Sequence, residues 1–240
     1  AIGNNALDAQ NSSTDTNIYN VGVGYAAGGA ITTGANNVLL GALAGDALTD
    51  ADANVAIGKS ALSADTLGSK SIAIGLGALQ SQNFSTATDS FNTAVGHGVG
   101  ASITTGQQNT LIGAEAGDAM TDALLNVAVG YQALSGETSG RKSIGIGYGA
   151  LLAQNVTTNS DVFNVAVGHF AGGSMTTGVK NVLIGGIAGD ALTDADLNLA
   201  VGHQALSADT KGSRSVAVGA FALQAQNFTT ATNSYNVAVG

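Results

Sequence analysis

The stretch Asn54-Val55-Ala56-Ile57-Gly58 carries the motif that decides the fold, and Ser71-Ile72-Ala73-Ile74-Gly75 is its next occurrence. The motif reads Asn or Ser, apolar, small or apolar, apolar, Gly. Its closing glycines fall at positions 3, 24, 41, 58, 75, 96, 113, 130, 147, 168, 185, 202, 219 and 240. The spacings between successive glycines read 21, 17, 17 and 17, and this order repeats to give a superrepeat with a period of 72. A fixed period is typical of architectures in which each repeat buries its neighbour.

The superrepeat divides the chain into three full copies, residues 25–96, 97–168 and 169–240, which follow a partial copy over residues 1–24. We therefore expect one repetitive segment over residues 1–240. The sequence starts and stops inside the motif, which favours a piece of a longer repetitive protein.

Each motif predicts a short β-strand. In Val55-Ala56-Ile57 the first and third side chains face one way and the middle one faces the other, and β-branched residues suit a strand. Glycine then allows a turn that a side chain would obstruct, and Asn at the motif start can form hydrogen-bonded ladders between coils. Coils in the 17/17/17/21 order of lengths predict an all-β, parallel β-solenoid. Helical repeats do not fit, because glycine recurs too often for a helix interior.

Apolar residues in the middle of the motif, among them Leu39, Leu111 and Leu183, indicate that the outward face of the strands is also covered. A strand that is apolar on both faces needs a partner on each side. We expect that partner to be another copy of the chain, because a single thin solenoid with so little apolar bulk would be marginally stable.

Two further positions of each coil predict core contacts. The third residue after the motif glycine is Ala in almost every coil, and the fourth is Gly or Leu. Where the fourth is Gly, the seventh is large and apolar: Ile31, Leu48, Ile103, Met120, Met175 and Leu192. Where the fourth is Leu, an acid can take the seventh place: Asp65, Glu137 and Asp209. This exchange predicts a packed interior in which volume at one position compensates for its loss at the other.

The fourth coil of each superrepeat is four residues longer and rich in Ser, Thr and Asn, over residues 83–90, 155–162 and 227–234. We expect each insert to form a loop that bulges outward. An aromatic residue then precedes the strand, at Tyr19, Phe91, Phe163 and Tyr235. This residue could attach the loop to its own chain or to a neighbouring one.

Composition excludes several partners. The net charge is −9 and the seven basic residues are scattered, which argues against a nucleic-acid partner because such affinity rests on Lys and Arg. The chain has no cysteine, so disulfides and thiolate metal sites are excluded. The sequence has no apolar run of about 18 residues, so it predicts no membrane span.

Clusters of acids leave a calcium hypothesis open. Aspartates gather once per superrepeat, at Asp46, Asp50 and Asp52, at Asp118 and Asp122, and at Asp190, Asp194 and Asp196. Calcium takes several oxygen ligands, but Leu124 replaces one of the acids and the calcium β-roll pattern is missing. Solvated turn acids are therefore the simpler interpretation. The histidines His97, His169 and His203 lack a second ligand nearby in sequence, which argues against a metal site.

The sequence predicts no catalytic residue, no cofactor site and no metal ligand, and hence no enzyme. A catalytic centre would interrupt the repeat at one place, and Gly-x-Ser-x-Gly is absent. The stretch Gly96-His97-Gly98-Val99-Gly100 lacks the Lys and the helix of a phosphate loop. Ice binding would need Thr on every coil of one face, whereas Thr pairs occur once per four coils, at Thr32-Thr33, Thr104-Thr105 and Thr176-Thr177.

The motif resembles the head repeat of trimeric autotransporter adhesins (YadA-like heads) and related repeats of phage tail fibre proteins. Segments such as Ala56-Ile57-Gly58-Lys59-Ser60-Ala61-Leu62 and Val129-Gly130-Tyr131-Gln132-Ala133-Leu134 carry the likeness, which covers the whole chain. The adhesin resemblance implies a left-handed parallel β-roll, a homotrimer around a central axis, and attachment to host matrix or cells. The phage resemblance implies a trimeric fibre region that carries a receptor-binding tip. Adhesin heads have shorter coils and lack the 21-17-17-17 order.

These observations together predict a structural segment of an extracellular trimeric fibre, on a cell or virion surface, that holds an adhesive tip away from that surface. The expected partners are other copies of the chain and a host surface glycan or matrix protein. The alternative is a receptor- or glycan-binding phage tail fibre region whose ligand contacts lie in the Ser/Thr-rich inserts.

Overall fold

The computed structural model describes residues 1–11 and 17–240 and contains strands, turns and no helix in these residues. The chain divides into two compact units, Ala1–Asp122 and Ala123–Gly240. Both units are parallel β-solenoids, so the predicted all-β solenoid fold is confirmed.

The first unit stacks its motif strands in the order β1-β2-β3-β5-β7-β8, and all pairs are parallel. Val21 pairs with Val38 and Ile72 with Thr93, which reproduces the shorter and the longer spacing of the motif glycines. The spacing of the motif glycines therefore predicts the register in which the strands pair. The strands are β1 Val21–Val23, β2 Val38–Leu40, β3 Val55–Ile57, β5 Ile72–Ile74, β7 Thr93–Val95 and β8 Thr110–Ile112. A short pair in the insert joins β4 Gly68–Ser69 to β6 Thr88–Asp89.

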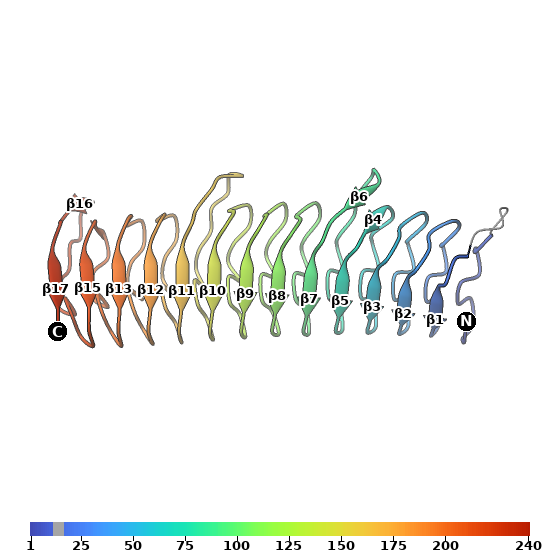
Figure 1. The fold of residues 1–240 in the computed structure, drawn as a ribbon, viewed down its shortest axis with the longest axis horizontal. Helices are drawn as coiled ribbons and strands as arrows, with labels where there is room; N and C mark the ends of the chain where they lie inside the picture. Colours follow the sequence, from blue (N-terminus) through green and yellow to red (C-terminus); the bar gives the residue numbers. More distant parts are fainter. Residues whose placement is uncertain (12–16) are drawn as a thin grey trace. The chain divides into compact units, whose positions relative to one another are not determined.

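The second unit repeats this arrangement in the order β9-β10-β11-β12-β13-β15-β17 (Figure 1). Its motif strands are β9 Val127–Val129, β10 Ile144–Ile146, β11 Val165–Val167, β12 Val182–Ile184, β13 Leu199–Val201, β15 Val216–Val218 and β17 Val237–Val239. The short strands β14 Gly212–Ser213 and β16 Thr232–Asn233 form the insert pair.

The motif glycines lie where coils approach most closely. Gly58 has a φ of +129°, and a Cβ atom there would lie 2.4 Å from the carbonyl oxygen of Gly75 in the next coil. No other residue fits such a contact without displacing the neighbouring backbone. The prediction that a side chain would obstruct this turn is confirmed.

Asparagines at the motif start form a buried ladder within each unit. The Asn54 side chain accepts the backbone N–H of Ser71 at 2.9 Å and donates to the Gly68 carbonyl at 2.9 Å. Its own backbone N–H donates to the side chain of Asn37 at 2.9 Å. Buried polar groups are tolerated when each has such partners, and the predicted ladders between coils are confirmed.

The sequence analysis placed the apolar middle residues of the motif on the outward face, and this expectation is wrong. The middle residues Leu39, Leu111 and Leu183 are fully buried inside the coils, while the first and third residues of each strand face outward. Alternation gives two faces of a strand but does not say which one is the interior. The narrow interior accepts mostly Ala or Gly at the middle position, because the core is also filled from the third, fourth and seventh positions.

Those positions form the core as predicted, since Ala27, Ile31 and Leu62 are all completely buried. The middle residue of the strand also takes part in this volume compensation. A Cβ on Gly28 or Gly45 would lie 2.5 or 2.8 Å, respectively, from a methyl group of Leu39. A Leu in the strand thus fills the space that these two glycines leave. The acids at the seventh position, Asp65, Glu137 and Asp209, are also completely buried.

Candidate functional site

Within each unit, the outward face of the stacked strands is the most continuous candidate surface. The first and third residues of the motif strands are Val, Ile or Leu everywhere except Thr93 and Thr110, and none is charged. Several keep more than a third of their surface exposed, for example Ile112 at 41% and Ile184 at 39%. Contiguous exposed apolar surface of this kind is typical of protein interaction sites.

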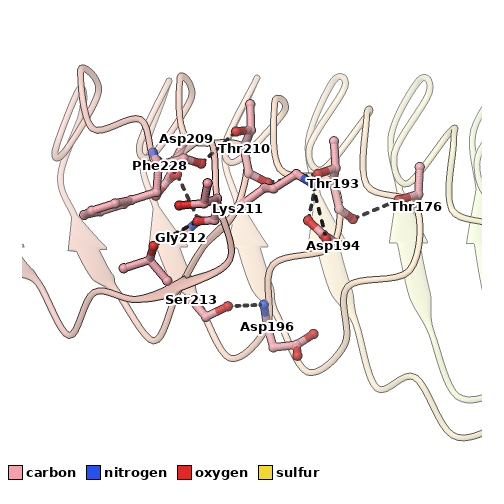
Figure 2. A network of polar contacts seen from close by, with 12 residues as sticks. Thr176, Thr193, Asp194, Asp196, Asp209, Thr210, Lys211, Gly212, Ser213 and Phe228 are labelled. Atoms are coloured by element: carbon pink, nitrogen blue, oxygen red, sulfur yellow. Dashed lines mark hydrogen bonds and ion pairs between the residues drawn. The ribbon is translucent and has the colours of Figure 1, made fainter.

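The inserts are a second candidate surface, and a buried acid anchors each of them. Asp209 accepts the backbone N–H groups of Gly212 at 3.0 Å and Phe228 at 2.9 Å (Figure 2). Its second oxygen accepts the side-chain amide of Gln226 at 2.6 Å. Gln226 occupies the seventh position of the following coil, so the acid and the amide join two coils where the insert begins.

The same anchor recurs in the other two copies. Gln82 donates to Asp65 at 2.6 Å, and Gln154 donates to Glu137 at 2.7 Å. The Glu137 carboxylate also accepts four backbone N–H groups, those of Thr138, Ser139, Gly140 and Val156. Sequence reasoning found the acids but missed their partners. The signal was available, because Gln follows at the seventh position of the next coil in every copy.

The far end of each insert is held by a cation, a hydrogen-bond acceptor and an aromatic ring. Lys70 forms an ion pair with Asp89 at 2.5 Å, and its Nζ lies 5.4 Å from the ring centroid of Phe91. The other copies use Lys142, Asp161 and Phe163, and then Arg214, Asn233 and Tyr235. The aromatic residue therefore attaches the insert to its own chain. Each contact is exposed and contributes less than about 1 kcal/mol, so the arrangement orients the loop more than it stabilises the fold.

The inserts extend outward as predicted, since Ser85, Thr86 and Ala87 are exposed and the loop that carries β6 extends beyond its neighbours (Figure 1).

Threonines form a column that the sequence analysis missed. The eighth residue after the motif glycine is Thr in three coils of each superrepeat and Asn in the fourth. The Thr176 hydroxyl donates to the Thr193 carbonyl at 3.2 Å, and Thr193 donates to the Thr210 carbonyl at 3.1 Å (Figure 2). These hydroxyls connect coils along one edge. The neighbouring ninth position varies, so the threonines form a single column.

Two aspartates of the calcium hypothesis, Asp52 and Asp196, hydrogen bond to neighbouring coils. Asp52 accepts the Ala35 N–H at 2.7 Å, and Asp196 accepts the Val179 N–H at 2.8 Å. Lys211 lies 3.7 Å from Asp194. Among the described residues, no three His, Cys, Asp or Glu side chains are placed to hold a metal ion.

Asp46, Asp118 and Asp190 differ from these acids. In each, Oδ1 is buried and receives no hydrogen bond from the described residues. Burial raises the pKa of all three carboxyls, and the negative charge of Glu115 raises the pKa of Asp118 further. The backbone N–H of the same residue offsets part of this effect on the pKa.

All three histidines are exposed, and His169 and His203 contact aromatic rings. Tyr148 stacks between Tyr131 and His169, with centroid distances of 5.5 and 5.2 Å, and Phe170 meets it edge-on. His203 contacts Phe221 in the same way. These rings stack mainly on one another. The part of the chain that the structure describes encloses no pocket.

Among residues 1–11 and 17–240, no long apolar helix suited to crossing a bilayer is present.

Comparisons with known proteins identify no relative. No protein-family model matches the chain, and neither a curated protein nor a solved structure matches it.

Proposed function

We propose that the chain is a structural segment of an extracellular homotrimeric fibre, on a cell or virion surface, that holds an adhesive tip away from that surface. In this proposal three left-handed solenoids pack their outward strand faces around a common axis.

The uncharged apolar strand face carries the proposal. A sheet that faces water on one side normally alternates apolar and polar residues, but here both sides of the motif strands are apolar. Burying Val, Ile and Leu stabilises by about 25 cal/mol per Å2 of apolar surface removed from water. Another copy of the chain suits this face because its strands have the same spacing and the same lack of charge.

The test is the mass of the native assembly by sedimentation equilibrium. We expect three times the chain mass of 23.4 kDa. Ile146→Lys combined with Ile184→Lys places charges on the proposed interface and should release monomers. Thr158→Lys combined with Thr230→Lys, in the exposed inserts, should leave the mass unchanged. Circular dichroism checks that the variants fold. A folded wild-type monomer, or an assembly that the strand-face variants leave intact, would refute the proposal.

A second candidate function is ligand binding by the inserts, for example to a receptor or to a host glycan or matrix protein. The contacts that fix each insert at both ends favour it, because a pre-organised loop loses less entropy on binding. Deleting one complete superrepeat, residues 97–168, separates the two functions. A spacer should keep its attachment to the host surface, whereas a binding segment should lose attachment in proportion to the inserts removed.

A further inference from the structure

Each insert begins with the acceptor pattern of asparagine-linked glycosylation, Asn-x-Ser/Thr with x other than proline. The pattern reads Asn83-Phe84-Ser85, Asn155-Val156-Thr157 and Asn227-Phe228-Thr229. Asn11-Ser12-Ser13 is a fourth match, and its two serines lie outside the described residues. The four asparagines recur with the period of the superrepeat, and no other asparagine in the sequence is followed by this pattern.

The structure presents the acceptor atoms at the surface. Asn83, Asn155 and Asn227 are exposed, whereas the asparagines of the motif ladder are mostly buried. Their Oδ1 atoms accept the hydroxyls of Thr66, Thr138 and Thr210 at 3.2, 2.9 and 3.4 Å. No described residue hydrogen bonds to their Nδ2 atoms, which are the atoms that glycosylation modifies.

The middle residue of the pattern holds this geometry in place. Phe84 and Val156 are buried, with 5% and 9% of their surface exposed, while the residues on either side face solvent. The buried side chain therefore directs the asparagine and the hydroxyl residue away from the core.

The fold does not explain the hydroxyl at the third position. Ser85, Thr157 and Thr229 are exposed, and their hydroxyls make no hydrogen bond to the described residues. The copies differ in this residue, Ser in one and Thr in two, and in the middle residue, yet the hydroxyl is kept and proline is absent. An exposed loop position without a structural role would tolerate almost any polar residue.

We propose that Asn83, Asn155 and Asn227 are glycosylation sites, modified by a separate transferase that uses a sugar carried on a diphosphate. The Asn Nδ2 attacks the anomeric carbon, so that an N–C bond forms and the C–O bond to the diphosphate breaks. The bonding electrons leave with the diphosphate, and the amide proton passes to a base of the transferase. A glycan at Asn155 and another at Asn227, four coils apart in the second unit, would follow each other at roughly 19 Å.

The test uses the full chain, secreted through a pathway that glycosylates Asn-x-Ser/Thr and measured by intact mass after denaturation. We expect the mass to exceed that of the polypeptide by sugars at these sites. Peptide N-glycosidase should remove them and convert each modified asparagine to aspartate. Asn155→Gln and Thr157→Val should each remove one glycan, whereas Thr157→Ser should retain it.

Thr158→Val and Asn159→Gln are matched controls, because both residues are exposed in the same insert and lie outside the pattern. Both variants should keep the full set of glycans. A reporter glycosylation site appended to the chain shows that the pathway is active. If that site is modified and Asn83, Asn155 and Asn227 are not, the proposal is overturned. Sugars that resist the glycosidase and leave by β-elimination are linked to Ser or Thr, and they would also overturn it. The chain purified from the cells that naturally make it should carry the same glycans. If that chain carries no sugar, the proposal is overturned. These readouts do not depend on oligomeric state, so they stand apart from the proposed trimer.

Discussion

Asp46, Asp118 and Asp190 occupy the same place in successive superrepeats, and each has a buried oxygen without a hydrogen-bond donor among the described residues. An unsatisfied buried carboxylate oxygen loses its hydration without compensation, which disfavours the charged form. Burial accordingly raises the pKa of each carboxyl in the folded chain. The ionised aspartates therefore oppose folding at neutral pH.

Replacing all three with asparagine should stabilise the chain at pH 7. The folded-state pKa lies above the ordinary value of 3.8, so the folded chain binds these protons more tightly than the unfolded one. The resulting stability is present below about pH 4 and is lost as pH rises through the raised pKa. The triple variant avoids this loss, so its urea midpoint should exceed that of the wild type at pH 7 and approach it near pH 4.

Asp52→Asn is the control for this prediction, because the Asp52 carboxylate already accepts the Ala35 N–H at 2.7 Å. It should bring no gain at pH 7. If the wild type and the triple variant differed by a constant amount from pH 4 to pH 8, the three carboxyls would not be the source of the pH dependence.

At the scale of the strands and coils, glycine spacing predicts where every motif strand lies and how it pairs. It does not predict which strand face is buried, as the interior position of Leu111 shows. Alternation is symmetric, and only the volume available inside the coil decides between the two faces. The left-handed backbone of residues such as Leu43, with φ at +59°, was also missed. Leu rarely adopts that region, so no local propensity indicates it.

The anchors of the inserts were only half predictable. The acids Asp65 and Glu137 stood out in the sequence, but their partner amides lie one full coil away. Recognising these pairs requires comparison of the same position in adjacent coils. The apolar strand face was predicted from the wrong residues, since its side chains come from the first and third strand positions.

Volume exchange between Gly100 and Leu111 gives a prediction at this scale. Leu111→Ala should cost about 2 to 5 kcal/mol, because it empties a buried site. Gly100→Leu should also destabilise the chain, because its Cβ would lie 2.9 Å from a methyl group of Leu111. The backbone itself accepts Leu, since φ at Gly100 is +55° and Leu134 has +54° at the equivalent position. The double variant should therefore lose less stability than the sum of the single variants.

Guanidinium unfolding of the four chains measures this double-mutant cycle. Strict additivity would show that the two positions do not share a volume. Leu134→Ala is the control, because Leu134 is not among the side chains nearest to Gly100. It should destabilise the chain, and Gly100→Leu should not restore the lost stability.

Across the whole molecule, the buried acid and its amide specify the order of the coils. Glu137 receives the Gln154 amide at 2.7 Å, and an apolar residue at that seventh position could not donate to it. The coil directly after the one with Gln154 belongs to the next superrepeat and carries Met175 at the seventh position. Met175 is apolar and completely buried. A coil that follows Glu137 must therefore be of the amide-bearing type. The repeat length alone would allow any coil to follow any other.

Deleting residues 148–168 tests this rule, because it joins Gly147 to His169 and removes one complete coil. Met175 then takes the place of Gln154, and the buried carboxylate of Glu137 loses its amide donor. Leaving such a group unpaired costs about 1 to 3 kcal/mol or more. Adding Met175→Gln to the deleted chain should restore the donor and recover about that amount in urea unfolding. In the full-length chain the same substitution buries an amide with no carboxylate opposite, so it should destabilise. The sign of the Met175→Gln effect therefore depends on the preceding coil, and the same sign in both chains would mean that the acid–amide pair does not set coil order.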